Sequence, residues 1–194
     1  MLKLPGPHDG LKIGLFGGSF NPAHDGHYHV AETVLNRLQL DWVWWLVARG
    51  NPLKSDHGDF EARFSSAAAY TRRHPRMRVS DIERQGRLTF SAEVIQAIKA
   101  RAATARFVWI MGGDNLQIFH KWKNWQTIAS EASIAVVARP GSQRSAMASK
   151  FAQFHSASRI SPKFARKLAS TSPPAWTYLP APLNHLSSSD IRQA

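Results

Sequence analysis

Short apolar runs alternate with longer stretches of helical periodicity along most of the chain. The first run, 12–16, lacks polar alternation, as expected for a strand buried on both faces. Further strands are predicted at 42–48, 77–82, 106–111, 134–138 and 176–179. Between them, apolar residues recur at three- and four-residue spacing, which predicts helices at 27–38, 60–74 and 91–103 and two short helices within 115–129. Strands that alternate with helices through short loops predict parallel βαβ units, and so an open α/β sheet flanked by helices.

The rest of the chain adds little to this organisation. Residues 142–172 are rich in Ser, Ala, Lys and Arg, and we expect a helix only at 162–169. We find no internal repeat and no interdomain linker, so a single domain is expected over residues 1–194. No apolar run approaches the ~20 residues that a membrane span needs. The absence of cysteine excludes disulfides and thiolate metal sites and is consistent with a cytoplasmic protein.

The first predicted strand runs into an unusual turn. Residues 13–27 read Ile-Gly-Leu-Phe-Gly-Gly-Ser-Phe-Asn-Pro-Ala-His-Asp-Gly-His. Gly17 and Gly18 let the backbone approach an anion, and the free N–H groups of a helix start point toward it. His24 and His27 add donors that can become cationic. This pattern indicates a phosphate site.

Other interpretations of the two histidines stay open at this point. Their spacing also suits a metal site, although only Asp25 and His29 lie nearby as further ligands, and a purely structural role is the third possibility. The dinucleotide pattern Gly-x-Gly-x-x-Gly is absent, and no Gly-Lys-Ser/Thr follows the glycines. The turn is therefore neither a dinucleotide fingerprint nor a P-loop.

More candidate residues follow other predicted strands. Because ligands of open α/β sheets bind beyond the carboxyl ends of the strands, the segment 51–54, Gly113, Asp114 and Arg139 are placed well for a site. Asp114 suits a ribose hydroxyl but also suits a helix cap. Trp122 and Trp125 suit either core packing or a flat surface for a heteroaromatic ring. The segment 187–192, Ser-Ser-Ser-Asp-Ile-Arg, suits either an anion cradle or an ordinary capped helix.

The charge balance favours anionic partners. Lys and Arg number 25 against 13 Asp and Glu, a net charge of +12. Nucleic acid, acidic membranes and phosphorylated small molecules all fit this balance. The closest approach to a basic cluster is 72–78, and we expect it to be a solvated helix end and strand entrance.

Two of these motifs together resemble the signatures of the nucleotidylyltransferase superfamily. Residues 17–27 match Gly-Gly-(Ser/Thr)-Phe-(Asp/Asn)-Pro-x-His-x-Gly-His, and residues 187–192 resemble Ser-Ser-(Ser/Thr)-x-(Ile/Leu)-Arg. Within the superfamily the chain resembles the bacterial nicotinate-nucleotide adenylyltransferases at 51–54, 110–116 and 136–141, and Trp122 and Trp125 match their tryptophan positions. Leu53, Phe90 and Ser91 depart from that family's usual residues.

The resemblance implies a Rossmann-like fold of the nucleotidylyltransferase type and a reaction. ATP and nicotinate mononucleotide would give nicotinate adenine dinucleotide and pyrophosphate in NAD biosynthesis, with Mg²⁺ accompanying ATP. The implied catalytic residues are His24, His27 and Arg192. The implied ATP site consists of Gly17, Gly18, Ser19, Phe20, His24, Gly26, His27, Gly113, Asp114, Ser188, Ser189 and Arg192. The implied nicotinate mononucleotide site consists of Lys54, Ser91, Trp122 and Arg139.

Three alternatives to this function remain. One is an adenylyltransferase that prefers nicotinamide mononucleotide. Another is a different sister enzyme, for phosphopantetheine or for cytidylyl transfer. The third is a basic nucleic-acid-binding module, which would not explain the paired signatures. The resemblance predicts small-molecule substrates, with neither nucleic acid nor a membrane as partner, and it leaves the oligomeric state open.

Overall fold

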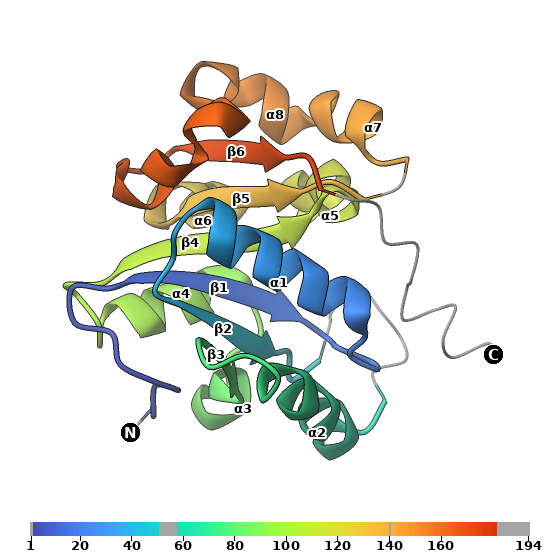
Figure 1. Ribbon diagram of the computed structural model, residues 1–194, viewed down its shortest axis with the longest axis vertical. Coiled ribbons are helices and arrows are strands. Elements are labelled where there is room, and N and C mark those ends of the chain that lie inside the picture. The colour runs from blue at the N-terminus through green and yellow to red at the C-terminus, as the bar shows by residue number, and fades with distance from the viewer. Residues whose placement is uncertain (1, 51–57, 140, 182–194) are drawn as a thin grey trace.

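The computed structural model describes residues 2–50, 58–139 and 141–181. Within these residues a six-stranded sheet is flanked by helices (Figure 1). The strands are β1 (Lys12–Gly18), β2 (Trp42–Val47), β3 (Met77–Ser80), β4 (Arg106–Gly112), β5 (Ser133–Val137) and β6 (Trp176–Leu179). The α-helices are α1 (Asp25–Arg37), α2 (Phe60–Thr71), α3 (Ile82–Gly86), α4 (Ser91–Lys99), α5 (Gly113–Ile118), α6 (Trp125–Glu131), α7 (Gln143–Met147) and α8 (Lys150–Phe154). The 3₁₀ helices are η1 (Phe119–Lys121), η2 (Ser156–Ser158) and η3 (Pro162–Ser170).

The strand order creates a crevice in the middle of the sheet. Every neighbouring pair is parallel, and the order is β3-β2-β1-β4-β5-β6. The chain builds outward from β1 to β3, then returns to β4 beside β1 and builds outward to β6. In such sheets ligands bind beyond the carboxyl ends of the strands where this direction reverses. The topology therefore predicts a ligand site beyond the carboxyl ends of β1 and β4.

The composition of β2 shows how the sheet is stabilised. Its sequence, Trp-Val-Trp-Trp-Leu-Val, has apolar side chains on both faces. Trp44 packs on the face that α4 and α6 cover, and Trp45 packs on the face that α1, α2 and η3 cover. Both indole rings are fully buried. Covering both faces requires helices on each side, which is what the α/β pattern predicted (Figure 1).

The predicted strands and main helices are present, with three differences. The strand expected at 77–82 ends at Ser80, where the hydroxyl accepts a hydrogen bond from Ile82 N–H at 3.3 Å and the chain turns into α3. The helix expected at 162–169 is the 3₁₀ helix η3. The short helices α3, α7 and α8 were not predicted, because five residues are too few to establish a helical period.

Candidate functional site

A cavity of about 510 Å³ opens beyond the carboxyl ends of β1 and β4. It lies at the point where the strand order reverses. Most of the residues predicted for the site line it, namely Gly17, Gly18, Ser19, His24, Gly26, His27, Ser91, Asp114, Trp122 and Arg139. The fold thus brings together residues that are separated by more than a hundred positions in the chain.

The floor of the cavity at β1 consists of backbone. A Cβ atom on Gly17 would lie 2.6 Å from the Trp109 ring of β4, so only glycine lets that ring pack against the strand. The following turn contains Phe20 in the left-handed region, at φ 47°. Its ring is 1% exposed and stacks on Trp45 at 5.0 Å, so the Phe20 side chain anchors the turn in the core and is not part of the cavity lining.

His24 and His27 form the start of α1. His24 is the N-cap and lies outside the helix, with an extended backbone, and its Nδ1 accepts a hydrogen bond from Gly26 N–H at 3.1 Å. The Nδ1 of His27 accepts a hydrogen bond from His24 N–H at 3.3 Å. Because each Nδ1 is an acceptor, each ring in its neutral form carries its hydrogen on Nε2.

The two imidazoles lie close together at the helix start. Their ring centroids are 3.8 Å apart, and both rings line the cavity. The helix N-terminus adds its own partial positive charge at this point. The metal interpretation placed both histidines on one helix face, but His24 lies before the helix. Among the residues that the structure describes, no three His, Cys, Asp or Glu side chains are grouped to hold a metal ion.

The ends of β4 and β5 also contribute to the cavity lining. Asp114, in the first turn of α5, and Arg139, after β5, form an ion pair with 3.7 Å between Oδ2 and Nη1. The Asp114 side chain is 54% exposed, so its carboxylate remains accessible to a ligand. Gly113 is not in the lining, because the space its side chain would occupy is filled by Ser142 and Tyr178.

Aromatic side chains form another part of the cavity lining. Trp122 lines the cavity and packs edge-on against Trp109, with ring centroids 6.5 Å apart. Phe90 and Ser91 also line the cavity at the start of α4, and Lys123 Nζ lies 4.3 Å from the Phe90 ring centroid. Trp125 is not in the lining and packs against Phe119 and other core rings. Trp125 therefore has the core-packing role, and the ring-binding role of Trp122 stays a prediction.

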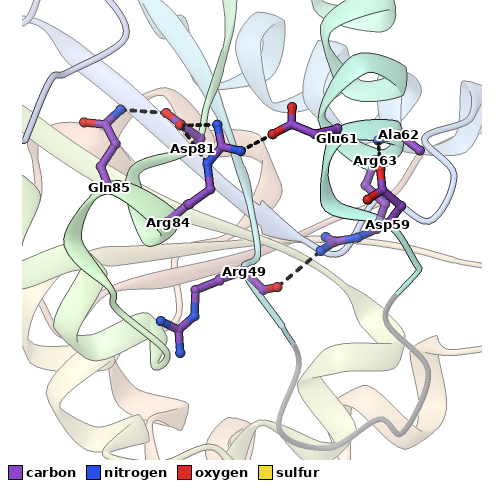
Figure 2. A network of polar contacts seen from close by, with 8 residues as sticks. All are labelled: Arg49, Asp59, Glu61, Ala62, Arg63, Asp81, Arg84 and Gln85. Carbon is purple, nitrogen blue, oxygen red and sulfur yellow. Dashed lines mark hydrogen bonds and ion pairs between the residues drawn. The ribbon is translucent and has the colours of Figure 1, made fainter.

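Two buried charged residues that were not predicted bind the backbone at the strand ends. Arg63 of α2 is 2% exposed and donates hydrogen bonds to the carbonyls of Ser19 and Ala48 at 2.9 and 2.7 Å. Its third acceptor is the carbonyl of Arg49 at 3.3 Å (Figure 2). Glu83 of α3 lines the cavity and accepts a hydrogen bond from Arg49 N–H at 2.9 Å.

Burial also changes the ionisation of Glu83. It raises the pKa of this carboxyl to about 7, although the hydrogen bond from Arg49 N–H and the positive charges of Arg63 and Arg49 act to lower it. A group with such a pKa changes charge near neutral pH. Figure 2 shows that Arg84, by contrast, pairs with Glu61 and Asp81, and these contacts are exposed.

Four predicted site residues lie outside the described residues. They are Lys54, Ser188, Ser189 and Arg192, and their roles stay predictions. Sequence reasoning missed several residues that line the cavity, among them Glu83, Thr89, Lys121 and Lys123. Lys121 and Lys123 flank Trp122 in the chain. Their position beside a predicted site residue was the one sequence feature that could have pointed to them.

The basic cluster at 72–78 is engaged in protein contacts. Arg73 pairs with Asp25 at 2.8 Å. Arg76 donates a hydrogen bond to the Leu40 carbonyl, and Arg78 lies over the Trp42 ring at 4.5 Å. These contacts agree with the expected helix end and strand entrance.

None of the described helices is both long and apolar enough to cross a membrane.

Comparison with known proteins identifies relatives along nearly the whole chain. Residues 15–194 match the family described as cytidylyltransferase-like. A probable nicotinate-nucleotide adenylyltransferase of Rhizobium meliloti is 43% identical over 189 residues, which cover 95% of this chain and 98% of that protein. Proteins with the same name from Ruegeria sp. and Cereibacter sphaeroides are 41% and 44% identical, each over 94% of this chain and 97% of their own length.

Solved structures share the fold. The Plasmodium falciparum nicotinic acid mononucleotide adenylyltransferase complexed with NaAD superposes with a TM-score of 0.71 at 17% identity, covering 94% of this chain and 83% of that one. A putative nicotinate-nucleotide adenylyltransferase from Vibrio parahaemolyticus gives a TM-score of 0.60 at 19% identity, covering 95% of this chain and 80% of that one. At these identities the likeness establishes the architecture, a Rossmann-like sheet of the nucleotidylyltransferase type.

Proposed function

The chain belongs to the nicotinate-nucleotide adenylyltransferase family, within the cytidylyltransferase-like group, and we propose that it transfers the adenylyl group of ATP to nicotinate mononucleotide. The products are nicotinate adenine dinucleotide and pyrophosphate, a step of NAD biosynthesis. One observation carries this proposal beyond the family: the two imidazoles, the glycine turn and the Asp114–Arg139 pair all line one cavity at the sheet crevice. Phosphate donors and a ribose acceptor thus share one binding space.

The reaction needs no base to prepare the nucleophile, because the phosphate of the mononucleotide is already an oxyanion. One of its oxygens attacks the α-phosphorus of ATP in line. The new P–O bond forms as the bond to the β-phosphate bridging oxygen breaks, and pyrophosphate leaves with that electron pair. No covalent intermediate with the enzyme forms. Catalysis then consists of positioning and charge stabilisation, as in phosphoryl transfer generally.

Each wall of the cavity has a role in this scheme. His24 and His27 donate from Nε2 to the ATP phosphates, with His27 at the α-phosphate, while Gly17, Gly18, Ser19 and Gly26 supply close backbone. Asp114 accepts from the adenosine ribose. Trp122 and Ser91 hold the nicotinate ring and its carboxylate, and Arg139 lies near the mononucleotide. Lys54, Ser188, Ser189 and Arg192 would complete the phosphate contacts.

Mg²⁺ would accompany the triphosphate. The described residues offer single carboxylates at the cavity and no cluster of three metal-ligating side chains. This donor set fits a cation held mainly by phosphate oxygens and water, which is how Mg²⁺ commonly binds nucleotides. The cation would screen the charge of the phosphates while the protein residues orient them. We further propose that residues 1–194 act as one domain in the cytoplasm and that the partners are these small molecules.

The test is an assay of pyrophosphate release from ATP with each mononucleotide in turn. The proposal predicts release with nicotinate mononucleotide, and none with ATP alone. Nicotinamide mononucleotide differs in lacking the carboxylate charge, so equal or faster turnover with it would favour the sister activity. Absence of release with both mononucleotides would reject adenylyl transfer to pyridine nucleotides.

A further inference from the structure

Helix α2 contributes no residue to the described cavity lining, yet its Arg63 is one of the most buried charged side chains in the molecule. Burying a guanidinium is unfavourable unless hydrogen bonds and an opposite charge compensate. Here all three acceptors are backbone carbonyls at the ends of β1 and β2. The Asp59 carboxylate caps the helix by accepting from Ala62 N–H at 2.7 Å, and this fixes the turn that carries Arg63 (Figure 2).

The peptide unit between Ala48 and Arg49 is held from both sides. Its carbonyl accepts from Arg63 at 2.7 Å, and its N–H donates to Glu83 Oε2 at 2.9 Å. The C=O and N–H of a trans peptide unit point in opposite directions. The Arg63 guanidinium therefore binds one side of this unit and the Glu83 carboxylate binds the other. Hydrogen bonds to charged groups are stronger than those between neutral groups. This unit lies at the cavity, since Ala48 and Glu83 are both in its lining.

The same face of α2 also holds the turn before the two histidines. Arg63 donates to the Ser19 carbonyl at 2.9 Å, which fixes the direction of the Phe20 N–H in the same peptide unit. Ser66, three residues further along the same helix face, accepts from Ala23 N–H at 3.1 Å. The backbone is therefore anchored to α2 on both sides of the turn, and Ala23 immediately precedes His24.

We propose that Arg63 and Glu83 are positioning residues for adenylyl transfer, a clamp that sets the backbone at the ends of β1 and β2 so that the substrate phosphates meet their donors in reactive geometry. This inference rests on the proposed function. The clamp acts through peptide orientation, and a displacement of about 1 Å in such a site can lower the rate by about 10²-fold. The charged groups that act on Glu83 are Arg63 from α2 and Arg49 from the end of β2.

The experiment compares Glu83→Gln, Arg63→Lys and their double variant with wild-type enzyme, measuring kcat and the KM for ATP and for nicotinate mononucleotide. Arg84→Lys is the matched control, because Arg84 belongs to the neighbouring network but bonds two carboxylates, the exposed Glu61 and the half-buried Asp81, and no strand-end carbonyl. Glutamine can still accept from Arg49 N–H but carries no charge. We expect kcat of Glu83→Gln to fall at least about tenfold, with each KM within about threefold of wild type. The control should keep wild-type values.

Two further readouts separate positioning from stability alone. The double variant should be no slower than the slower single variant, because both changes open one clamp. The kcat of wild-type enzyme should rise with pH through about 7 by more than that of Glu83→Gln, which lacks the ionisation. Arg63→Lys is assayed at a temperature where circular dichroism shows it folded, and Glu83→Gln keeps the test decisive if the lysine variant fails to fold.

The outcomes distinguish this inference from the proposed function. Active wild-type enzyme with unchanged kcat and pH profile in Glu83→Gln would overturn the clamp alone. Multiplying losses in the double variant would also overturn it. Wild-type enzyme that transfers adenylyl groups to neither mononucleotide would reject the proposed function, and the clamp's role with it.

Discussion

The histidine turn and the Arg63–Glu83 clamp meet at the same cavity but are built in opposite ways. The Nδ1 of His27 accepts from His24 N–H, three positions away, and the Nδ1 of His24 accepts from Gly26 N–H, two positions away. Arg63 reaches acceptors 44, 15 and 14 positions away, and Glu83 reaches a donor 34 positions away. The first group is a local motif that presents donors to a ligand. The second is a long-range contact that orients backbone, and it exists only in the folded chain.

Removing Arg63 gives the largest expected change in stability. Arg63→Ala leaves three strand-end carbonyls without their Arg63 donor and removes one of the two positive charges near Glu83, so the free energy of unfolding should fall by about 3–5 kcal/mol. Urea unfolding followed by circular dichroism measures this. Arg84→Ala should change the urea midpoint much less, because Arg84 itself is 45% exposed and its partners Glu61 and Asp81 are 67% and 21% exposed. Similar midpoints for the two variants would show that the clamp does not stabilise the strand ends.

Removing His27 should lower kcat, and the protein should remain folded. His27→Ala loses a donor to the transition state, so kcat should fall by on the order of 10²–10³ while the protein stays folded. His29→Ala is the control on the same helix, because His29 does not line the cavity. Steady-state pyrophosphate release measures both. Near-normal turnover in folded His27→Ala would remove His27 from the catalytic group.

The negative charge of Glu83 should lower the free energy of unfolding, although it should raise kcat. Burial raises its pKa from 4.5 to about 7, so folding favours the protonated carboxyl. That stabilisation is fully present below about pH 4.5 and is lost as the pH rises through 7. Glutamine cannot ionise, so Glu83→Gln should become more stable than wild type by about 1–3 kcal/mol as the pH rises from 5 to 8. Thermal unfolding across this range checks the sign, and a stability difference independent of pH would contradict it.

The smallest expected effect concerns Asp114. Its carboxylate is half-exposed in the ion pair with Arg139, and Asp114→Asn keeps the shape but weakens a hydrogen bond to the ribose. A loss of about 1 kcal/mol corresponds to a rise of about fivefold in the KM for ATP, with a smaller change in kcat. Asp9→Asn, an exposed change outside the cavity lining, should leave both constants unchanged. An unaltered KM for ATP in Asp114→Asn would remove Asp114 from the nucleotide site.

The contrast between the two regions also explains what the sequence could predict. Buried strands and amphipathic helices repeat over enough residues to be recognised, and so the sheet and its flanking helices were predicted. The glycine turn and His24 and His27 form one contiguous motif. Arg63 sits on α2 among alanines and serines with nothing to mark it as buried, and Glu83 fell just beyond a predicted strand that in fact ends at Ser80. Their importance depends on the packing of α2 and α3 against strand ends.

The bond formed in the reaction, between a phosphate oxygen of the mononucleotide and the α-phosphorus of ATP, can be tested with an isotope. Nicotinate mononucleotide that carries ¹⁸O in all its phosphate oxygens is incubated with ATP and the enzyme, and both products are analysed by mass spectrometry. The account predicts that nicotinate adenine dinucleotide retains all the label and that the pyrophosphate contains none. Label in the pyrophosphate, or loss of label from the dinucleotide, would contradict it.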